Sequence, residues 1–208
     1  MEEISTTARL KGELSAGAVM SEYTADETMI EACRRGDADA FRQLFEIYKD
    51  RVFSIALSFF NGDEASAMDI TQQVFLKLMT RMHQFQNRSE FSTWLHRLVA
   101  NTCLDRKRAL RRLIFFGNVV EAEVKPQRVS FDDRMERREL EAAVQQAIAG
   151  LKPKLRMAIL LKYFEDLSYE EIASALGCSK GTVASRLNRG HQILARKLAH
   201  LRSGSGGA

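Results

Sequence analysis

The chain has 208 residues, enough for one large or two small domains, and 45% of them are apolar, which is ample for packed cores. Its 31 Lys and Arg residues against 27 Asp and Glu residues leave a net charge of only +4, so the places where positive charge gathers matter more than the total, and nucleic acid is the expected acidic partner. With two prolines, 12 glycines and no apolar run long enough to cross a membrane, the composition predicts an all-helical, soluble, cytoplasmic protein.

The N-terminal half of the chain contains four stretches with apolar residues at helical spacing. We expect a flexible tail over residues 1–24 and a first helical domain over residues 25–112. Asp37 or Asp39 can cap its second helix, and Asp63 can cap the third. The predicted helices are 28–35, a long helix ending at Phe60, 63–83 and 90–112, with a polar loop at 84–89.

The predicted helix at 90–112 changes character along its length. It begins with apolar residues, but from Arg97 to Arg112 it carries six positive residues and one negative residue. A basic helix end beside aromatic residues suits melted nucleic acid, which needs cations for its backbone and rings or a shaped pocket for unstacked bases. Phe91 and Trp94 lie on the core stripe and are interpreted mainly as packing residues. The better candidates for reading a base lie in the preceding loop and are Gln86, Asn87 and Arg88.

A linker over residues 113–134 leads to a second helical domain over residues 135–202, and a flexible tail is expected at 203–208. Apolar spacing predicts two helices in the first part of this domain, at 136–149 and from Pro153 to about Phe164. The fold class expected from the whole chain is therefore all-α, with two small helical domains joined by a linker.

The second domain ends in the most distinctive stretch of the chain. Ser168 followed by Glu171 is a capping box, which marks the start of a helix. Gly177 can take the left-handed conformation that ends that helix, and Ser179 can cap the next one. Two short helices around a glycine turn predict a helix-turn-helix, whose second helix can enter the major groove of DNA.

The second helix of this motif has one apolar and one basic face. From Ser179 to Arg202 there are six Lys or Arg residues and no Asp or Glu, whereas an ordinary solvated helix mixes the two signs. A face of one sign suits phosphates, and its side chains can reach base edges. The alternative is a basic surface helix in a three-helix core. The apolar stripe is Val183, Leu187, Leu194, Leu198 and Leu201, and the opposite face carries Thr182, Ser185, Arg186 and Arg189.

Cysteine and histidine, which often act in catalysis or bind metals, are scattered along this chain. Cys33, Cys103 and Cys178 form no CxxC pair, so no disulfide or metal site is expected, and they are interpreted as small buried residues of a reducing compartment. No nucleophile, base or metal-ligand spacing surrounds the four histidines. We therefore expect no cofactor and no enzymatic activity.

Taken together, these features resemble the extracytoplasmic-function sigma factors, the small group of the bacterial sigma-70 family. The resemblance covers about residues 25–202, and it depends on five motifs that are weak singly but strong in this order and spacing. The motifs are Asp37-Ala38-Asp39-Ala40-Phe41, Asp69-Ile70-Thr71-Gln72-Gln73-Val74-Phe75-Leu76, Phe91-Ser92-Thr93-Trp94-Leu95, Asn101-Thr102 and Leu167-Ser168-Tyr169-Glu170-Glu171-Ile172-Ala173.

The resemblance implies a subunit that directs core RNA polymerase to promoters and helps to open the −10 element. It implies docking on the polymerase clamp helices through Asp69, Gln72, Gln73 and Leu76. It implies capture of the single-stranded −10 element through Gln86, Asn87, Arg88, Asn101, Arg106, Arg108, Arg111 and Arg112. It implies binding of the −35 duplex through Lys180, Thr182, Ser185, Arg186 and Arg189. Because members of this group are commonly held by an anti-sigma factor, such a partner is also expected.

One departure from the family pattern concerns the predicted clamp-binding segment. Family members usually carry several acidic residues across Ser66 to Gln73, and this chain keeps only Asp69. Lost carboxylates should weaken docking on the basic clamp helices, unless other contacts compensate for them. A second interpretation is conditional activity, in which a kinase restores negative charge at Ser66 or Thr71.

Two other functions compete with this interpretation. A stand-alone regulator would use only the helix-turn-helix and leave the first domain as a sensor or a dimerisation module. The clamp-like segment and the basic end of the helix at 90–112 argue against it. An enzyme is the other alternative, and no motif in the sequence supports one.

Overall fold

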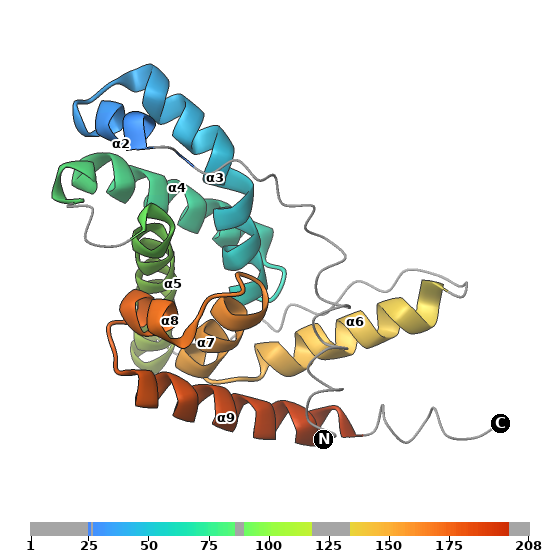
Figure 1. Ribbon diagram of the computed structural model, residues 1–208. Coiled ribbons are helices and arrows are strands. Elements are labelled where there is room, and N and C mark those ends of the chain that lie inside the picture. Colours follow the sequence, from blue (N-terminus) through green and yellow to red (C-terminus); the bar gives the residue numbers. More distant parts are fainter. Residues whose placement is uncertain (1–24, 26, 86–89, 118–133, 200–208) are drawn as a thin grey trace.

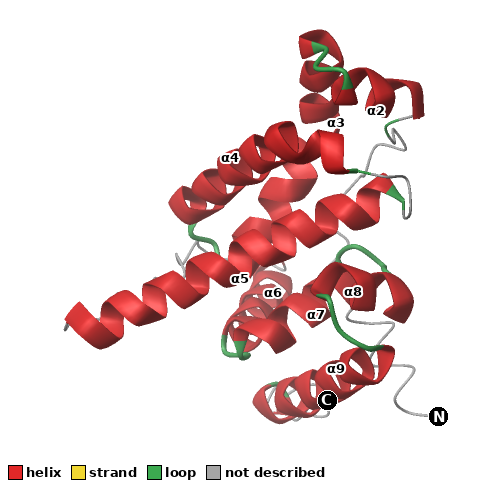
Figure 2. Cartoon of the chain, turned by 90° about the vertical axis from the view of Figure 1, so that its left-hand side faces the viewer, coloured by secondary structure: helices red, strands yellow, loops and turns green. Residues whose placement is uncertain are grey.

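The computed structural model describes residues 25, 27–85, 90–117 and 134–199, without the side chains of 114–117 and 134–141. All regular structure in this part is helical, which confirms the predicted all-α class (Figures 1 and 2). The tails at 1–24 and 203–208, the loop residues 86–89 and most of the expected linker lie outside the described residues. The helices are α2 (Glu27–Arg34), α3 (Ala38–Phe59), α4 (Glu64–Arg81), the 3-10 helix η2 (Met82–Gln84), α5 (Phe91–Gly117), α6 (Arg134–Ala149), α7 (Pro153–Tyr163), α8 (Tyr169–Leu176) and α9 (Lys180–Lys197).

The long helices of the first domain begin where their capping aspartates predict. Asp37, and not Asp39, caps α3, because its Oδ1 accepts hydrogen bonds from the backbone amides of Asp39 and Ala40, both at 2.9 Å. Asp63 caps α4 in the same way, accepting from the amide of Ser66 at 3.0 Å. Each carboxylate satisfies amides that a helix start leaves without partners and places negative charge at the positive end of the helix dipole.

The helix-turn-helix also forms as predicted. The amide of Ser168 donates to Glu171 Oε2 at 2.7 Å, and the amide of Glu171 donates to Ser168 Oγ at 3.2 Å, which completes the capping box of α8. Gly177 ends α8 with a φ of +58°, in the left-handed region that costs glycine little. Ser179 then caps α9 by accepting a hydrogen bond from the amide of Thr182 at 3.2 Å.

The core of the first domain lies among α3, α4 and α5, with α2 packed on α3. The apolar stripes predicted for the three long helices are mostly buried there, which confirms their orientation. Phe41, Phe45 and Trp94 are half-buried at the edge of this core. The buried stripe residues are Leu44, Tyr48, Val52, Ile55, Ala56, Phe59, Ala67, Ile70, Val74, Phe75, Leu78, Met82, Phe91, Leu95, Leu98, Val99 and Thr102.

Helix α5 runs five residues past the end expected at Arg112, to Gly117. The residues between them, Leu-Ile-Phe-Phe, contain no helix breaker, so nothing in the chain stops the helix before the glycine. In contrast, α9 ends at Lys197 and is four residues shorter than its apolar stripe suggested. None of the described helices is long and apolar enough to cross a lipid bilayer.

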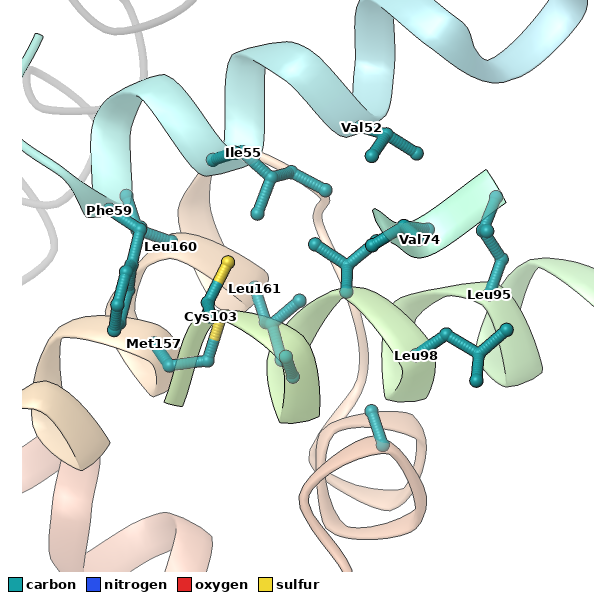
Figure 3. Packing of buried hydrophobic residues seen from close by; sticks show 14 of the residues in the cluster. Val52, Ile55, Phe59, Val74, Leu95, Leu98, Cys103, Met157, Leu160 and Leu161 are labelled. Atoms are coloured by element: carbon teal, nitrogen blue, oxygen red, sulfur yellow. The ribbon is translucent and has the colours of Figure 1, made fainter. Parts of the chain in front are cut away.

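The second domain does not stand apart from the first. The apolar spacing of α7 marks one face, formed by Leu155, Ala158, Ile159 and Leu160, but Met157, Leu161 and the charged Arg156 are buried as well. A helix that is buried all round has neighbours on every side. Helix α7 packs against α8 and α9 of its own domain and against α3 and α5 of the first, so the buried residues of both domains form one cluster (Figure 3).

The cysteines are all free, and their burial agrees with the sequence interpretation at two of the three positions. Cys33 and Cys103 are buried, and burial raises the pKa of the Cys33 thiol and raises that of Cys103 to about 12. Cys178 is partly exposed at the helix-turn-helix turn, where its sulfur accepts a hydrogen bond from Arg186.

Candidate nucleic-acid interface

The surface predicted to read duplex DNA lies on α9. Val183, Leu187 and Leu194 bury one side of this helix against the second domain. The periodicity of the helix therefore turns the residues between them outward. Of the five predicted −35 residues, Lys180, Ser185 and Arg189 are exposed, whereas Thr182 and Arg186 are half-buried. The structure thus brings all five onto the first three turns of one helix.

Two of the α9 cations are already engaged with neighbouring groups. Lys180 forms an ion pair with Glu170 of α8, and both side chains are more than half exposed. Arg186 donates a hydrogen bond from Nη1 to Cys178 Sγ at 3.4 Å, which holds its guanidinium beside the turn of the motif. An exposed ion pair contributes little stability, so the Lys180 ammonium can exchange its carboxylate for a phosphate at small cost.

The residues predicted to bind the −10 element separate into three groups. Asn101 is exposed on α5, and Arg108, Arg111 and Arg112 are exposed on the same helix toward its C-terminal end. Arg106 lies closer to α4, with its Nη2 3.6 Å from Asp69 Oδ2. The remaining three predicted residues, Gln86, Asn87 and Arg88, fall outside the described residues.

Aromatic side chains support the base of this loop from within the core. The rings of Phe85, Phe91 and Trp94 pack on one another with centroids 5.4 to 5.9 Å apart. Phe85 and Phe91 are only 4% and 6% exposed, so they cannot stack on a nucleobase without leaving the core. The packing role predicted for Phe91 is confirmed, and Phe85, for which no packing role was predicted, packs against it. Any aromatic contact with a flipped base would fall to the half-buried Trp94.

The four residues predicted to bind the polymerase clamp share the outer face of α4. Asp69, Gln72, Gln73 and Leu76 are all exposed. Two apolar neighbours lie on this face: Met68, which falls in the segment where the family pattern has acidic residues, and Met79, which sequence reasoning did not single out. Met68, Leu76 and Met79 are 65%, 53% and 56% exposed, an unusual exposure for side chains of this size.

The three candidate surfaces occupy different parts of the molecule. In both ribbon views α5 lies between α4 on one side and α8 and α9 on the other (Figures 1 and 2). The candidate clamp surface and the candidate −35 surface therefore lie on opposite sides of α5. The exposed cations at the end of α5 belong to neither side.

The structure also identifies charged residues that sequence reasoning did not single out. Glu165, in the turn between α7 and α8, accepts a hydrogen bond from Arg51 of α3 and shares another with His96 of α5 at 2.8 Å. Arg156 of α7 donates to the backbone oxygen of Phe59 at 2.5 Å. All of these contacts join the two domains, and no local pattern marks such residues.

Two family models match the chain, Sigma-70 region 2 over residues 44–113 and Sigma-70 region 4 over residues 141–194. Two solved structures have a similar fold. One is the sigma factor RpoE in complex with the anti-sigma factor NepR from Bartonella quintana, with a TM-score of 0.61, 22% identity and coverage of 78% of this chain and 98% of that one. The other is CnrH in complex with the cytosolic domain of CnrY, with a TM-score of 0.61, 24% identity and coverage of 85% and 99%.

Proteins with a similar sequence also match most of the chain. The chain is 31% identical over 180 residues to the ECF RNA polymerase sigma factor SigW of Bacillus subtilis, which covers 83% of this chain and 96% of that protein. It is 32% identical over 190 residues to the ECF RNA polymerase sigma-E factor of Escherichia coli, with 88% and 98% covered. The chain therefore belongs to the extracytoplasmic-function group of the sigma-70 family and is an RNA polymerase sigma factor.

Proposed function

We propose that this sigma factor recruits core RNA polymerase through α4, binds the −35 element of a promoter as duplex through α9, and captures the melted −10 element through α5 and the loop before it. The observation that carries the proposal is the one-signed exposed face of α9, set directly after a helix-turn-helix turn. No reaction is assigned to the chain itself, because the polymerase carries the chemistry.

The proposed −35 contact rests on the position of the side chains along α9. The N-terminal turns of the second helix in such a motif enter the major groove. Arg186 and Arg189 lie there, and an arginine can bind guanine O6 and N7 with two hydrogen bonds. Lys180 and the hydroxyls of Thr182 and Ser185 are assigned to phosphates or base edges beside them.

The proposed −10 contact rests on α5. Arg108, Arg111 and Arg112 are exposed at its basic end and can neutralise the backbone of a single strand, while Asn101 offers an amide that can read a base. Arg106 has a second role in this proposal. Its proximity to Asp69 joins the helix that carries the −10 surface to the helix that carries the clamp surface.

Apolar contacts support docking on the polymerase despite the missing carboxylates. The exposed side chains of Met68, Leu76 and Met79 lie on the same helix as Asp69, and methionines adapt readily to a partner surface. We propose that this apolar stripe compensates for the reduced charge of α4.

Two regulators remain part of the proposal. An anti-sigma factor is expected because the structurally similar RpoE and CnrH were each solved with a partner protein, in the first case an anti-sigma factor. A kinase acting on Ser66 or Thr71 would add negative charge to α4. Both hydroxyls now donate hydrogen bonds within the helix, Ser66 to Asp63 at 2.7 Å and Thr71 to the carbonyl of Ala67 at 2.8 Å, so a phosphate would replace these bonds.

In vitro transcription with core polymerase on genomic fragments, with mapping of the start sites, tests the proposal. We expect start sites that appear only when both the chain and core polymerase are present, and that share two separated sequence elements. Sequence-specific binding to duplex DNA by the chain alone, with no effect on polymerase, would support the stand-alone regulator instead.

A further inference from the structure

One ion pair joins the first turns of the two helices of the helix-turn-helix. Glu170 lies in the first turn of α8, Lys180 is the first residue of α9, and Lys180 Nζ donates a hydrogen bond to Glu170 Oε1. This hydrogen bond is the main cause that lowers the pKa of Glu170, so the carboxylate is charged at neutral pH. The side chains of Glu170 and Lys180 are 60% and 62% exposed. The motif therefore presents an anion and a cation side by side at the end of α9 that is proposed to enter the groove.

The placement of Lys180 does not serve the start of either helix. Glu171, the neighbour of Glu170, completes the capping box of α8, and Ser179 caps α9. A positive charge in the first turn of a helix is unfavourable, because it lies at the positive end of the helix dipole. An exposed ion pair also contributes little stability. The pair therefore points to a role outside the fold.

Glu170 acts on one cation of α9. Among the described side chains, it is the carboxylate that pairs with a cation of this helix. The next cation along α9 is Arg186, and residues 181–185 between it and Lys180 are uncharged. Arg186 is held by Cys178 instead. Removing the charge of Glu170 therefore changes the surroundings of Lys180 without releasing a second cation.

A lysine without a neighbouring carboxylate binds phosphates regardless of the base sequence. Beside Glu170 this preference changes. Exchanging the carboxylate for a phosphate costs the fold little, but it would leave Glu170 unpaired next to that phosphate, where the two negative charges repel each other. The acceptors on a base edge carry no full charge and are repelled much less. An ammonium has three donors, so Lys180 can keep its bond to Glu170 and still donate to guanine O6 and N7.

The positions of the two residues in the motif suit this division. In a helix-turn-helix, the first residues of the second helix contact base edges, while the first helix crosses the DNA backbone. Lys180 is the residue that begins the second helix, and Glu170 belongs to the first. The carboxylate therefore approaches the ammonium from the side where the phosphates lie.

We propose that Glu170 is a specificity-determining residue of the −35 surface, which holds the ammonium of Lys180 toward the edge of a guanine and away from the phosphates. The proposal rests on the binding of the −35 duplex through α9 proposed above, and it assigns Lys180 to a base. Glu170 then weakens binding to unrelated DNA more than binding to the correct element, and so raises the ratio of the two affinities.

The salt dependence of sequence-independent binding tests the first half of this proposal. Glu170→Gln keeps the size of the side chain and removes its charge. For the full chain on a labelled duplex without a promoter, we expect the affinity to rise at least about threefold and the plot of log K against log salt to steepen by about 0.9, because Lys180 then neutralises one more phosphate. Fluorescence anisotropy measures both. Asp166→Asn removes the same charge from an exposed aspartate in the turn before α8 and should leave the slope unchanged. Equal slopes for wild type and Glu170→Gln would overturn the proposal.

The base preference of the polymerase complex tests the second half. Transcription by core polymerase and the chain on a library with a randomised −35 element should select guanine at one position, and Glu170→Gln and Lys180→Ala should each relax that position alone. Glu170→Lys combined with Lys180→Glu keeps an ion pair but reverses its direction. A carboxylate accepts a hydrogen bond from cytosine N4, so the base selected at that position should change from guanine to cytosine. An unchanged preference in the reversed pair would overturn the assignment of Lys180 to a base.

The same library separates the failure of this proposal from the failure of the proposed function. Arg186→Ala should relax a different position of the −35 element. If it does so while Glu170→Gln and Lys180→Ala leave every position as in wild type, the role of Glu170 is refuted and the proposed −35 surface stands. If wild type selects no conserved −35 element at all, the proposed DNA contact of α9 is refuted, and the role of Glu170 with it.

Discussion

Glu165 places a carboxylate inside the protein, where its side chain is only 6% exposed. Burial by itself would raise the pKa of Glu165, but the hydrogen bond with His96 and the positive charge of Arg51 outweigh burial, so the pKa lies below its ordinary value. Removing one partner of a buried cluster is costly because the others stay behind without compensation. The residue therefore matters more to the contact between the two domains than its single charge suggests.

A pH dependence of stability follows from this lowered pKa. A group whose pKa is lower in the folded than in the unfolded protein stabilises the fold above its ordinary pKa, and this stabilisation is lost as pH falls through the lowered value. We expect the free energy of unfolding, measured by urea denaturation, to fall as the pH drops below the ordinary range of a glutamate. The Glu165→Gln variant should lack this component.

The Glu165→Gln variant also distinguishes the titration of Glu165 from that of a neighbouring carboxylate. Glu171 of α8 has a lowered pKa, first because of its hydrogen bonds with Ser168 and also because of its proximity to His96, so the cap of α8 weakens over a similar pH range. Circular dichroism at each pH separates the loss of that helix from the loss of the contacts of Glu165 with Arg51 and His96. An identical pH profile in wild type and Glu165→Gln would contradict the assignment to Glu165.

Single substitutions at Arg186 and Arg189 test the proposed base contacts. Replacing either with alanine should weaken transcription from promoters with an intact −35 element by about 1–3 kcal/mol if its guanidinium binds a base. The loss should be smaller on promoters that carry a different base at the contacted position. Equal weakening on every promoter would show that the side chain contacts only phosphates, and a shallower salt dependence would accompany it.

Single residues differ in how far sequence could predict them. The caps at Asp37, Asp63 and Ser168 depend on the next three residues, and all three were predicted correctly apart from the choice between Asp37 and Asp39. Arg51 and Glu165 are 114 positions apart and meet only because two domains close on each other. Nothing near either residue in the chain encodes that contact.

Among the helices, α9 carries both a buried face that supports the fold and the proposed DNA-binding face. Leu187 is 1% exposed in the middle of the buried face of α9. The proposed −35 residues lie on the other side of the helix. Leu187→Ala should lower the free energy of unfolding by about 2–5 kcal/mol, because the truncated side chain leaves a cavity. Urea denaturation measures this change.

The matched control is Asn188→Ala, one position along on the exposed side of α9. Away from caps and buried contacts, such a surface change should alter stability by less than about 0.5 kcal/mol. A Leu187→Ala protein as stable as this control would contradict the orientation of α9, and with it the proposed DNA-binding face.

Helix α4 provides a test of the proposed polymerase docking. Gln73 is exposed and lies outside the apolar stripe, so an acidic residue there should leave both the fold and the stripe intact. We expect Gln73→Glu to raise the affinity for core polymerase if the missing carboxylates limit docking. No gain would refute that limitation, and with it the case for a kinase at Ser66 or Thr71, and would leave the apolar stripe of Met68, Leu76 and Met79 as the sufficient contact.

Helix α7 shows where prediction from periodicity stops. Its spacing indicated one buried face, because a helix in a small separate domain needs only one. The other face is buried by α3 and α5, which belong to a different domain. In the same way, an apolar segment after Arg112 was interpreted as linker, although it continues α5 to Gly117. Both differences arise because tertiary contacts and helix propagation do not depend on local composition alone.

At the scale of the whole molecule, the two proposed DNA-binding surfaces are carried by two domains that pack as one body. The candidate clamp surface on α4 and the candidate −35 surface on α9 lie on opposite sides of α5 (Figure 1). The exposed cations at the end of α5 belong to neither side, so the three proposed contacts do not share one face of the molecule.

The central claim is that one chain reads two separate promoter elements with two different helices. Selection of active promoters from a randomised template library, with core polymerase and either wild type, Arg186→Ala or Asn101→Ala, tests it most directly. The account predicts two separated conserved blocks for wild type, with Arg186→Ala relaxing only the upstream block and Asn101→Ala only the downstream one. A single conserved block, or one block relaxed by both variants, would contradict it.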